Sequence, residues 1–381
     1  PSLLSIYPLD SVYLELRFSE PLGAASILNS GTFSISGGLP ELSSVQAADY
    51  RNQSFQILLN QALQKGVLYQ LITQEAIEDC TGNILPAGVS MFFGLPSEPN
   101  ASDVIINEIL TNPPETGSDY IELLNHSEWV FDLSSLALTY QSLTSSGTPK
   151  TIFLPARLML PGEYYCLTRN PQTLLSQYFT PFPTRVIACN NLPDFASDSG
   201  LVFIHRKENP SLETDRLKYS SDMHFSILKD QDGVSLERIN PGRSPADPTN
   251  WTSASEASGF GTPAAQNSQY AVHPASSGIL TVSPEIFSPD GDGTDDLAHI
   301  CITPPSEGYL VNLSIFDTQG RLIRRLAQNF SLGKEATLSW DGSRDNRSKA
   351  ATGLYVVLCE LYDLSGNQEF LKATLALGIS L

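Results

Sequence analysis

Apolar residues alternate with polar ones along most of this sequence, and this period of two constrains the fold more than any other feature. Leu14, Leu16 and Phe18 follow the pattern near the start, and Phe55 and Ile57 repeat it. Such a period places apolar side chains on one face of a strand. Turn residues separate many short runs of this kind, which is typical of β-sandwiches. Helical periodicity is confined to residues 171–179, so the sequence predicts an all-β fold.

The charge of the chain bears on its partners. Among 381 residues, 22 are Lys or Arg and 41 are Asp or Glu, which gives a formal net charge of −19. This charge repels polyphosphate and attracts cations, so we expect no nucleic acid partner. Charged residues make up only 17% of the chain, a low share that is common in secreted β-rich proteins. No stretch approaches the roughly 18 consecutive apolar residues of a membrane-spanning helix, so no transmembrane segment is predicted.

Two polar, proline-containing stretches divide the chain. Residues 95–101 follow a strand-like run, and residues 271–278 precede another. Linkers of this composition are semi-extended and make few contacts. The length allows two to four domains, and the two breaks predict three of them, at residues 1–97, 101–270 and 278–381.

The first piece carries structural motifs only. An FSEP segment at residues 18–21 is followed by a strand-like run at 66–71 and by a D-x-x-GN turn at 79–83. This order resembles bacterial Ig-like domains. The resemblance implies a spacer or surface module without catalysis.

The middle piece has an ordered series of motifs. They are VIINEI (104–109), DYIELLN (119–125), LPGEY (160–164), GVSLER (233–238), NW (250–251), GTP (261–263) and NS (267–268). The series resembles the bacterial lamin-tail domain, an Ig-fold sandwich of surface and secreted proteins, often of Bacteroidetes. Residues 206–222 insert a polar stretch that departs from this pattern, and we expect any specific contact of the domain to lie there.

Polar residues interrupt two apolar strands of the middle piece. Asn107 and Glu108 lie in one strand, and Glu122 and Asn125 lie in the other. Buried polar groups need hydrogen-bond partners. We therefore expect a structural role rather than catalysis, such as a glutamate that holds the backbone N–H groups of a loop.

The third piece opens with F-S-P-D-G-D-G at residues 287–293 and closes with W-D-G at 340–342 and G-L-Y at 353–355. It is similar to the FlgD-like Ig module and to the gliding-motility-associated C-terminal domain, a family that contains signals for type IX secretion. The segment 324–326 favours the first family. Together, the resemblances imply three tandem Ig-like β-sandwich domains.

One loop of the third piece has ligand chemistry. Asp290, Asp292 and Asp296 alternate with glycines, and Asp295 and the Thr294 carbonyl add further oxygens. Calcium takes six to eight oxygen ligands, and glycines allow the tight curl that such a loop needs. The alternative is a solvated turn in which the aspartates cap their own backbone. Repulsion among four neighbouring carboxylates favours a bound Ca²⁺.

Motifs for catalysis and transition metals do not occur. The five cysteines are scattered (Cys80, Cys166, Cys189, Cys301, Cys359), and the sequence leaves open whether Cys301 and Cys359 pair. The five histidines lack zinc-site spacing, and there is no nucleophile elbow or phosphate-binding loop. We predict no catalytic residue and no organic cofactor.

These patterns predict a non-catalytic structural or binding protein, exported to the bacterial cell surface at the outer-membrane face. Its Ig-like modules would present loops to a surface protein or a glycan, with a role in cell adhesion. Two alternatives remain open. The chain could be the non-catalytic C-terminal part of a larger exported hydrolase (nuclease, phosphatase or protease), or an accessory subunit of an outer-membrane complex. We expect any export signal to lie outside this sequence.

Overall fold

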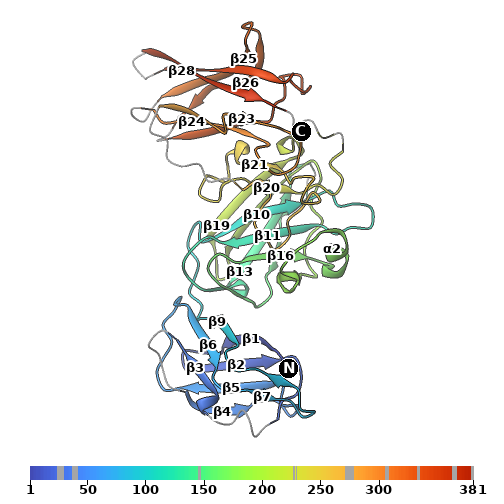
Figure 1. Ribbon diagram of the computed structural model, residues 1–381, viewed down its shortest axis with the longest axis vertical. Helices are drawn as coiled ribbons and strands as arrows, with labels where there is room; N and C mark the ends of the chain where they lie inside the picture. The colour runs from blue at the N-terminus through green and yellow to red at the C-terminus, as the bar shows by residue number, and fades with distance from the viewer. Residues whose placement is uncertain are drawn as a thin grey trace.

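The structure, a computed structural model, describes residues 1–23, 30–36, 42–144, 147–225, 228, 230–270, 279–304, 309–332, 335–362 and 367–378. Strands make up 47% of it and helices 6%, which confirms the all-β fold class. Three modules follow one another along the long axis in Figure 1: an N-terminal module (1–93), a middle module (104–270) and a C-terminal module (279–378). Within the described ranges, no helix combines the length and the hydrophobicity that a membrane-spanning helix needs.

The N-terminal module is built from two main sheets. Its described strands are β1 (Leu3–Pro8), β2 (Tyr13–Phe18), β3 (Phe33–Ile35), β4 (Leu42–Ala47), β5 (Ser54–Leu59), β6 (Tyr69–Thr73), β7 (Ile77–Glu78), β8 (Ile84–Leu85) and β9 (Ser90–Phe93). One sheet has the order β1-β2-β5-β4 and the other β3-β6-β9, while β7 pairs with β8. The alternation predicted for β2 and β5 is confirmed, because Leu14, Leu16, Phe55 and Ile57 lie in the cluster between the sheets.

The middle module also packs two main sheets around one hydrophobic cluster, to which the small β12-β15 sheet adds. Its described elements are β10 (Val104–Leu110), β11 (Tyr120–Asn125), β12 (Phe131–Asp132), β13 (Leu136–Ser142), β14 (Lys150–Phe153), β15 (Leu158–Met159), β16 (Tyr164–Thr168), α2 (Pro171–Gln177), β17 (Val186–Ala188), β18 (Ser199–Arg206), β19 (Asn209–Ser220), β20 (Leu236–Arg238) and β21 (Trp251–Ser253). The larger sheet has the order β17-β16-β11-β10-β20-β21, and the second has the order β14-β13-β18-β19. The helix predicted near residues 171–179 is confirmed as α2, whose first turn is capped by the Asn170 side chain.

A shift of register in β10 determines which side chains face which side of the larger sheet. Ile106 pairs with Leu123 and Glu108 with Glu122, so Asn107 is an extra residue in β10. Ile106 consequently faces the inner cluster, while Glu108 points to the opposite face. There the sheet is covered by α2 and by residues 261–269, which pack against a second apolar cluster. Both faces of the sheet are therefore buried.

The C-terminal module has two sheets as well. Its described strands are β22 (Leu280–Ser283), β23 (Ile286–Phe287), β24 (Ala298–Ile302), β25 (Leu310–Asp317), β26 (Leu322–Ser331), β27 (Ala336–Trp340), β28 (Gly353–Tyr362) and β29 (Gln368–Leu377). The orders are β22-β24-β27 and β23-β29-β28-β25-β26. Cys301 lies on β24 and Cys359 on β28, in different sheets, and both are free thiols.

The joint between the N-terminal and middle modules is a chain of main-chain hydrogen bonds. The N–H of Gly66 donates to the Leu95 carbonyl (2.7 Å), and the Gly66 carbonyl accepts from Val130 (3.1 Å). The N–H of Ser97 donates to the Val130 carbonyl (2.9 Å). The expectation that residues 95–101 make few contacts is therefore wrong for 95–97. Because a buried backbone group must find a partner, this short segment pairs with both modules.

Replacing Gly94 by alanine should disturb this joint. A Cβ atom at Gly94 would lie 2.4 Å from the Val67 carbonyl oxygen and 2.8 Å from Val130 Cγ2, so backbone must move. We expect a loss of about 1–3 kcal/mol in the free energy of unfolding and a changed angle between the modules by small-angle X-ray scattering. Gly378→Ala is the control, because its Cβ would meet the nearest atom at an ordinary 3.7 Å. Equal scattering curves for both variants would contradict this account of the joint.

The middle and C-terminal modules touch through side chains and loops. Arg243 and Thr249 of the middle module both donate to the Thr337 carbonyl at the edge strand β27, at 2.5 and 3.1 Å. Asp222 forms an ion pair with Arg347 (2.8 Å). The predicted linker at 271–278 lies outside the described residues. These three contacts use side chains of the middle module, whereas the joint at its other end includes three main-chain hydrogen bonds.

Candidate metal centre at the contact between the middle and C-terminal modules

The acidic loop of the C-terminal module curls tightly between β23 and β24. Gly291 and Gly293 have φ angles of +85° and +84°, a region that favours glycine. The N–H of Ser288 donates to the Asp295 carbonyl (2.9 Å) and closes the loop. This backbone turns successive aspartates toward a common centre.

Three of the predicted ligands come together in this loop. Carboxylate oxygens of Asp290, Asp292 and Asp296 all lie within 4.8 Å of one another. Asp290 and Asp292 are exposed, whereas Asp296 is only 4% exposed. Asp295 is exposed and does not belong to the group, and Thr294 is exposed beside Asp292.

Backbone N–H groups already bond to these carboxylates. The two oxygens of Asp296 accept from the N–H groups of Gly291 (2.7 Å) and Gly293 (2.8 Å). Asp292 accepts from the Thr294 N–H (2.7 Å), and Asp290 accepts from the Asp292 N–H (3.2 Å). These hydrogen bonds are the ones expected of a solvated turn in which the aspartates cap their own backbone. Each carboxylate oxygen has further lone pairs, however, so the bonds leave room for a cation.

The donor set suits a hard cation. It consists of carboxylate oxygens, which Ca²⁺ and Mg²⁺ prefer, and it has neither sulfur nor imidazole. Three negative charges at this distance repel one another, and a bound divalent cation would relieve the repulsion. Ca²⁺ tolerates an irregular ligand arrangement better than Mg²⁺ does. The residues therefore fit calcium chemically.

The acidic loop is seated on the middle module. The Gln269 amide donates to Asp296 Oδ2 (3.0 Å), and the N–H of Ala257 donates to the Gly291 carbonyl (3.2 Å). A Cβ atom at Gly293 would lie only 3.0 Å from the Ser255 hydroxyl. The geometry of the loop is thus tied to the contact between the two modules.

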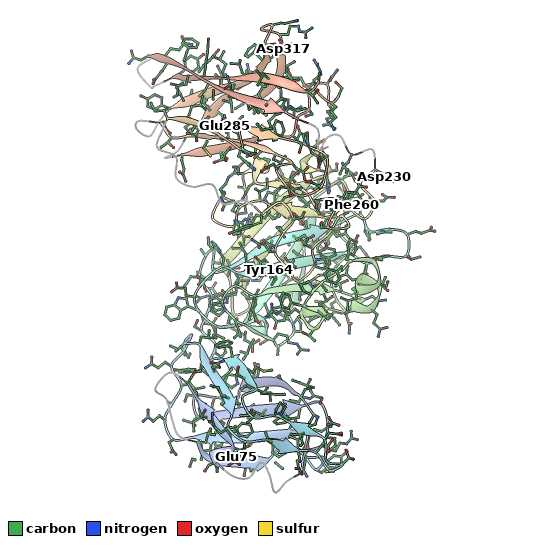
Figure 2. The ribbon with its side chains drawn as sticks, in the orientation of Figure 1. Glu75, Tyr164, Asp230, Phe260, Glu285 and Asp317 are labelled. Carbon is green, nitrogen blue, oxygen red and sulfur yellow. The ribbon has the colours of Figure 1, made fainter. Side chains whose placement is uncertain are left out.

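Two cavities of about 320 Å³ each lie beside Asp296 between the modules. One is lined by Phe260 and Gln269 of the middle module together with Pro289 and Lys349. Figure 2 shows Phe260 close to the boundary between the two modules. The other cavity is lined in part by Thr294. Water and small ions therefore have access to the loop.

Buried glutamates of the middle module hold the segment that carries Gln269. Glu108 accepts the backbone N–H of Thr262 (2.9 Å), Glu122 accepts that of Ala264, and Glu237 accepts that of Gln269 (2.8 Å). The prediction that glutamates of β10 and β11 hold the N–H groups of a loop is confirmed. Glu237 was not singled out from the sequence, since only its pairing with Glu108 in the folded sheet shows its role.

The other polar residues predicted to need partners also have them. The Asn125 amide donates to the carbonyls of Trp129 (2.7 Å) and Met159 (3.0 Å). The polar stretch 206–222 forms mostly β19, which pairs with β18. Its Asp215 forms a buried ion pair with Arg238 (2.9 Å). Part of this stretch therefore serves the fold of the middle module.

Comparisons with known proteins give distant likenesses only. No protein-family model matches the chain, and no curated protein matches it. The N-terminal part of the bacterial S-layer protein SbsC is 15% identical with a TM-score of 0.24, over 57% of this chain and 43% of that one. Domains 1–6 of SbsC are 10% identical with a TM-score of 0.23, over 99% and 54%. A DUF4876 family protein from Bacteroides thetaiotaomicron is 12% identical with a TM-score of 0.24, over 54% and 83%. The chain thus spans about half the length of the SbsC structures, and these scores carry no functional inference.

Proposed function

We propose that the chain is a non-catalytic structural and binding part of an exported bacterial surface protein, located at the outer-membrane face. Its β-sandwich modules act as a spacer that presents loops to a surface protein or a glycan. The chemistry of the loops, rather than a catalytic cleft, would set the choice of partner.

The joint at residues 95–97 is the observation that carries this proposal. A spacer must keep its modules in line, and here main-chain hydrogen bonds link the first two modules directly. The modules follow one another along a single long axis (Figure 1). Two buried carboxylates of the middle module, Glu108 and Glu237, hold backbone N–H groups in place, which is a structural use of ionisable residues.

Surface exposure in the source bacterium tests the proposal. We expect antibodies against the folded chain to label intact cells, and external protease to remove the label without lysis. Label that appears only after lysis would overturn the surface location. A catalytic domain encoded ahead of residue 1 would instead identify the chain as part of a larger hydrolase, and stable co-purification with an outer-membrane protein would favour an accessory subunit.

We further propose that the acidic loop binds Ca²⁺ and stiffens the contact with the middle module. A ligand that binds only the folded state stabilises it, by about 2.7 kcal/mol at one hundred times its Kd. We therefore expect calcium to raise the melting temperature of the C-terminal module relative to a chelator control. Unchanged melting on calcium addition would contradict the proposal.

The matched control is the double variant Asp290→Asn with Asp292→Asn. An asparagine oxygen can still accept the backbone N–H groups that these aspartates accept, so the turns are preserved. The variant removes two of the three charges in the group. It should fold without calcium and lose the calcium-dependent rise in melting temperature.

A further inference from the structure

Three glutamates form a row across neighbouring strands of the larger sheet in the middle module. Glu122 on β11 and Glu237 on β20 are both register partners of Glu108 on β10. Directly opposite side chains of antiparallel strands have Cβ atoms about 4.5–5.5 Å apart, and like charges there destabilise the sheet. All three glutamates are fully buried. Fully ionised, the row would place three adjacent negative charges in the interior.

Neutral groups donate every hydrogen bond recorded to Glu108 and Glu237. Glu108 Oε1 accepts from the hydroxyls of Tyr120 (2.7 Å) and Ser235 (2.5 Å) and from the Thr262 N–H. Glu237 Oε2 accepts from the Ser268 hydroxyl (2.9 Å) and the Gln269 N–H. The described residues thus supply no lysine or arginine bond to either carboxyl, so no ion pair offsets their burial.

The remaining oxygen of each carboxyl faces one hydroxyl. Thr262 Oγ1 lies 3.2 Å from Glu108 Oε2 and 2.8 Å from Glu237 Oε1. A threonine hydroxyl has a single hydrogen and can donate to only one of them. Were both carboxylates ionised, the other contact would oppose lone pairs of two oxygens without a hydrogen between them. With both carboxylates ionised, one hydrogen atom is therefore missing from the two contacts of the Thr262 hydroxyl.

We propose that Glu108 and Glu237 share one bound proton through the Thr262 hydroxyl. The shorter contact assigns the threonine hydrogen to Glu237 Oε1. The extra proton then resides on Glu108 Oε2 and is donated to Thr262 Oγ1. In this arrangement Glu108 Oε1 is the carbonyl oxygen of a carboxylic acid and still accepts its three hydrogen bonds. The two carboxyls titrate as a unit.

The surroundings favour the protonated pair. The titratable groups that face it are Glu122 and Tyr120 on β11, Cys166 on β16, and Tyr178 just after α2. Residues 261–269, which cover the row, contain no titratable side chain. Arg238 follows Glu237 in β20 but is engaged with Asp215. Burial raises the pKa of both carboxyls, and if Glu108 were ionised as well, its charge would add to the burial and raise the pKa of Glu237 to about 7.

The shared proton makes the hold on residues 262–269 depend on pH. A carboxyl whose pKa is raised in the folded state contributes stability that is complete below its unfolded pKa, about 4.5. That stability is lost as the pH rises through about 7. One such proton lowers the folding equilibrium constant by up to tenfold per pH unit inside this window. Loss of the proton would weaken the hold on residues 262–269, and Gln269 of this segment is the residue that bonds to the acidic loop.

The test compares the full-length chain with Glu108→Gln, Glu237→Gln and the double variant between pH 5 and 8. The transition of the middle module is identified as the one that Leu138→Ala lowers, since Leu138 lies in its inner cluster. Glutamine keeps the shape of the side chain and offers Thr262 an N–H without a titrating proton. We expect each single variant to flatten the pH dependence by the same amount, and the double variant to flatten it no further.

Glu213→Gln on the same module is the matched control. Its hydrogen bond to Arg216 lowers the pKa of Glu213, so the stability from this ion pair is complete above about pH 4.5 and is lost only at more acidic pH. The variant should therefore keep the wild-type slope above pH 5. Equal slopes for wild type and both row variants would overturn the proposal, as would two independent, additive steps. Infrared spectroscopy at pH 6 gives a second readout that needs no variant to fold. A wild-type spectrum without a protonated carboxyl band would also overturn it.

Discussion

Asp215→Ala should lower the free energy of unfolding of the middle module by about 3–5 kcal/mol, because it leaves a buried arginine without its counter-charge. The carboxylate of Asp215 accepts from Arg238 Nη1 (2.9 Å) and from the Ile106 N–H (2.8 Å). The side chains of the pair are 4% and 3% exposed. Chemical denaturation of the full chain, followed at the middle-module transition, measures the loss.

A neighbour on the same strand provides the control. Glu213 pairs with Arg216 on the surface, where the two side chains are 32% and 52% exposed. Exposed pairs contribute at most about 1 kcal/mol, since water screens both charges. Glu213→Ala should therefore cost far less than Asp215→Ala. Similar losses for the two variants would show that Asp215 is not the buried anchor that its contacts indicate.

Trp340→Ala is expected to destabilise the C-terminal module by about 3–5 kcal/mol. The indole is fully buried between the rings of Phe287 and Tyr355, with centroids 5.3 and 4.9 Å away. Its N–H donates to the buried Ser343 carbonyl (2.8 Å), which would lose its partner. Since Phe287 leads into the acidic loop, the same variant should weaken any calcium response.

Trp129→Ala is the control, because it removes a tryptophan that lies outside the C-terminal module. Trp129 is half exposed and packs over Gly66 at the joint between the N-terminal and middle modules. It should leave the melting of the C-terminal module unchanged. Calorimetry of both variants gives the two outcomes directly, and a C-terminal transition that survives Trp340→Ala intact would contradict the packing described for β27.

The alternation of apolar and polar residues in the short strands could be predicted from the sequence, because it depends only on neighbours along the chain. In β2, residues such as Leu14 and Leu16 face one cluster and their neighbours face outward. The strand β10 is different, since all seven of its residues are buried and no alternation exists to be detected. The presence of polar residues in such a strand was the signal that partners were needed. The predicted domain boundaries stay a prediction.

The contacts between distant segments could not be predicted, because they depend on register and on docking. The row of glutamates requires Asn107 to be an extra residue in β10, and a shift by one position would turn Glu108 to the other face. The acidic loop could be located from its aspartates and glycines alone. Its contact with Gln269 could not be predicted, because 26 residues, including the predicted linker, lie between Gln269 and Asp296.

The joint at residues 95–97 has a consequence for a chain under tension. Gly66 donates to Leu95 on one side and accepts from Val130 on the other, so one residue of the N-terminal module bonds to both the connecting segment and the middle module. A force that pulls the two modules apart must break both bonds before the connecting segment can extend. Among the described residues, the middle and C-terminal modules share one main-chain hydrogen bond, from Ala257 to Gly291 (3.2 Å), and their other hydrogen bonds use side chains. Tension should therefore open that contact first.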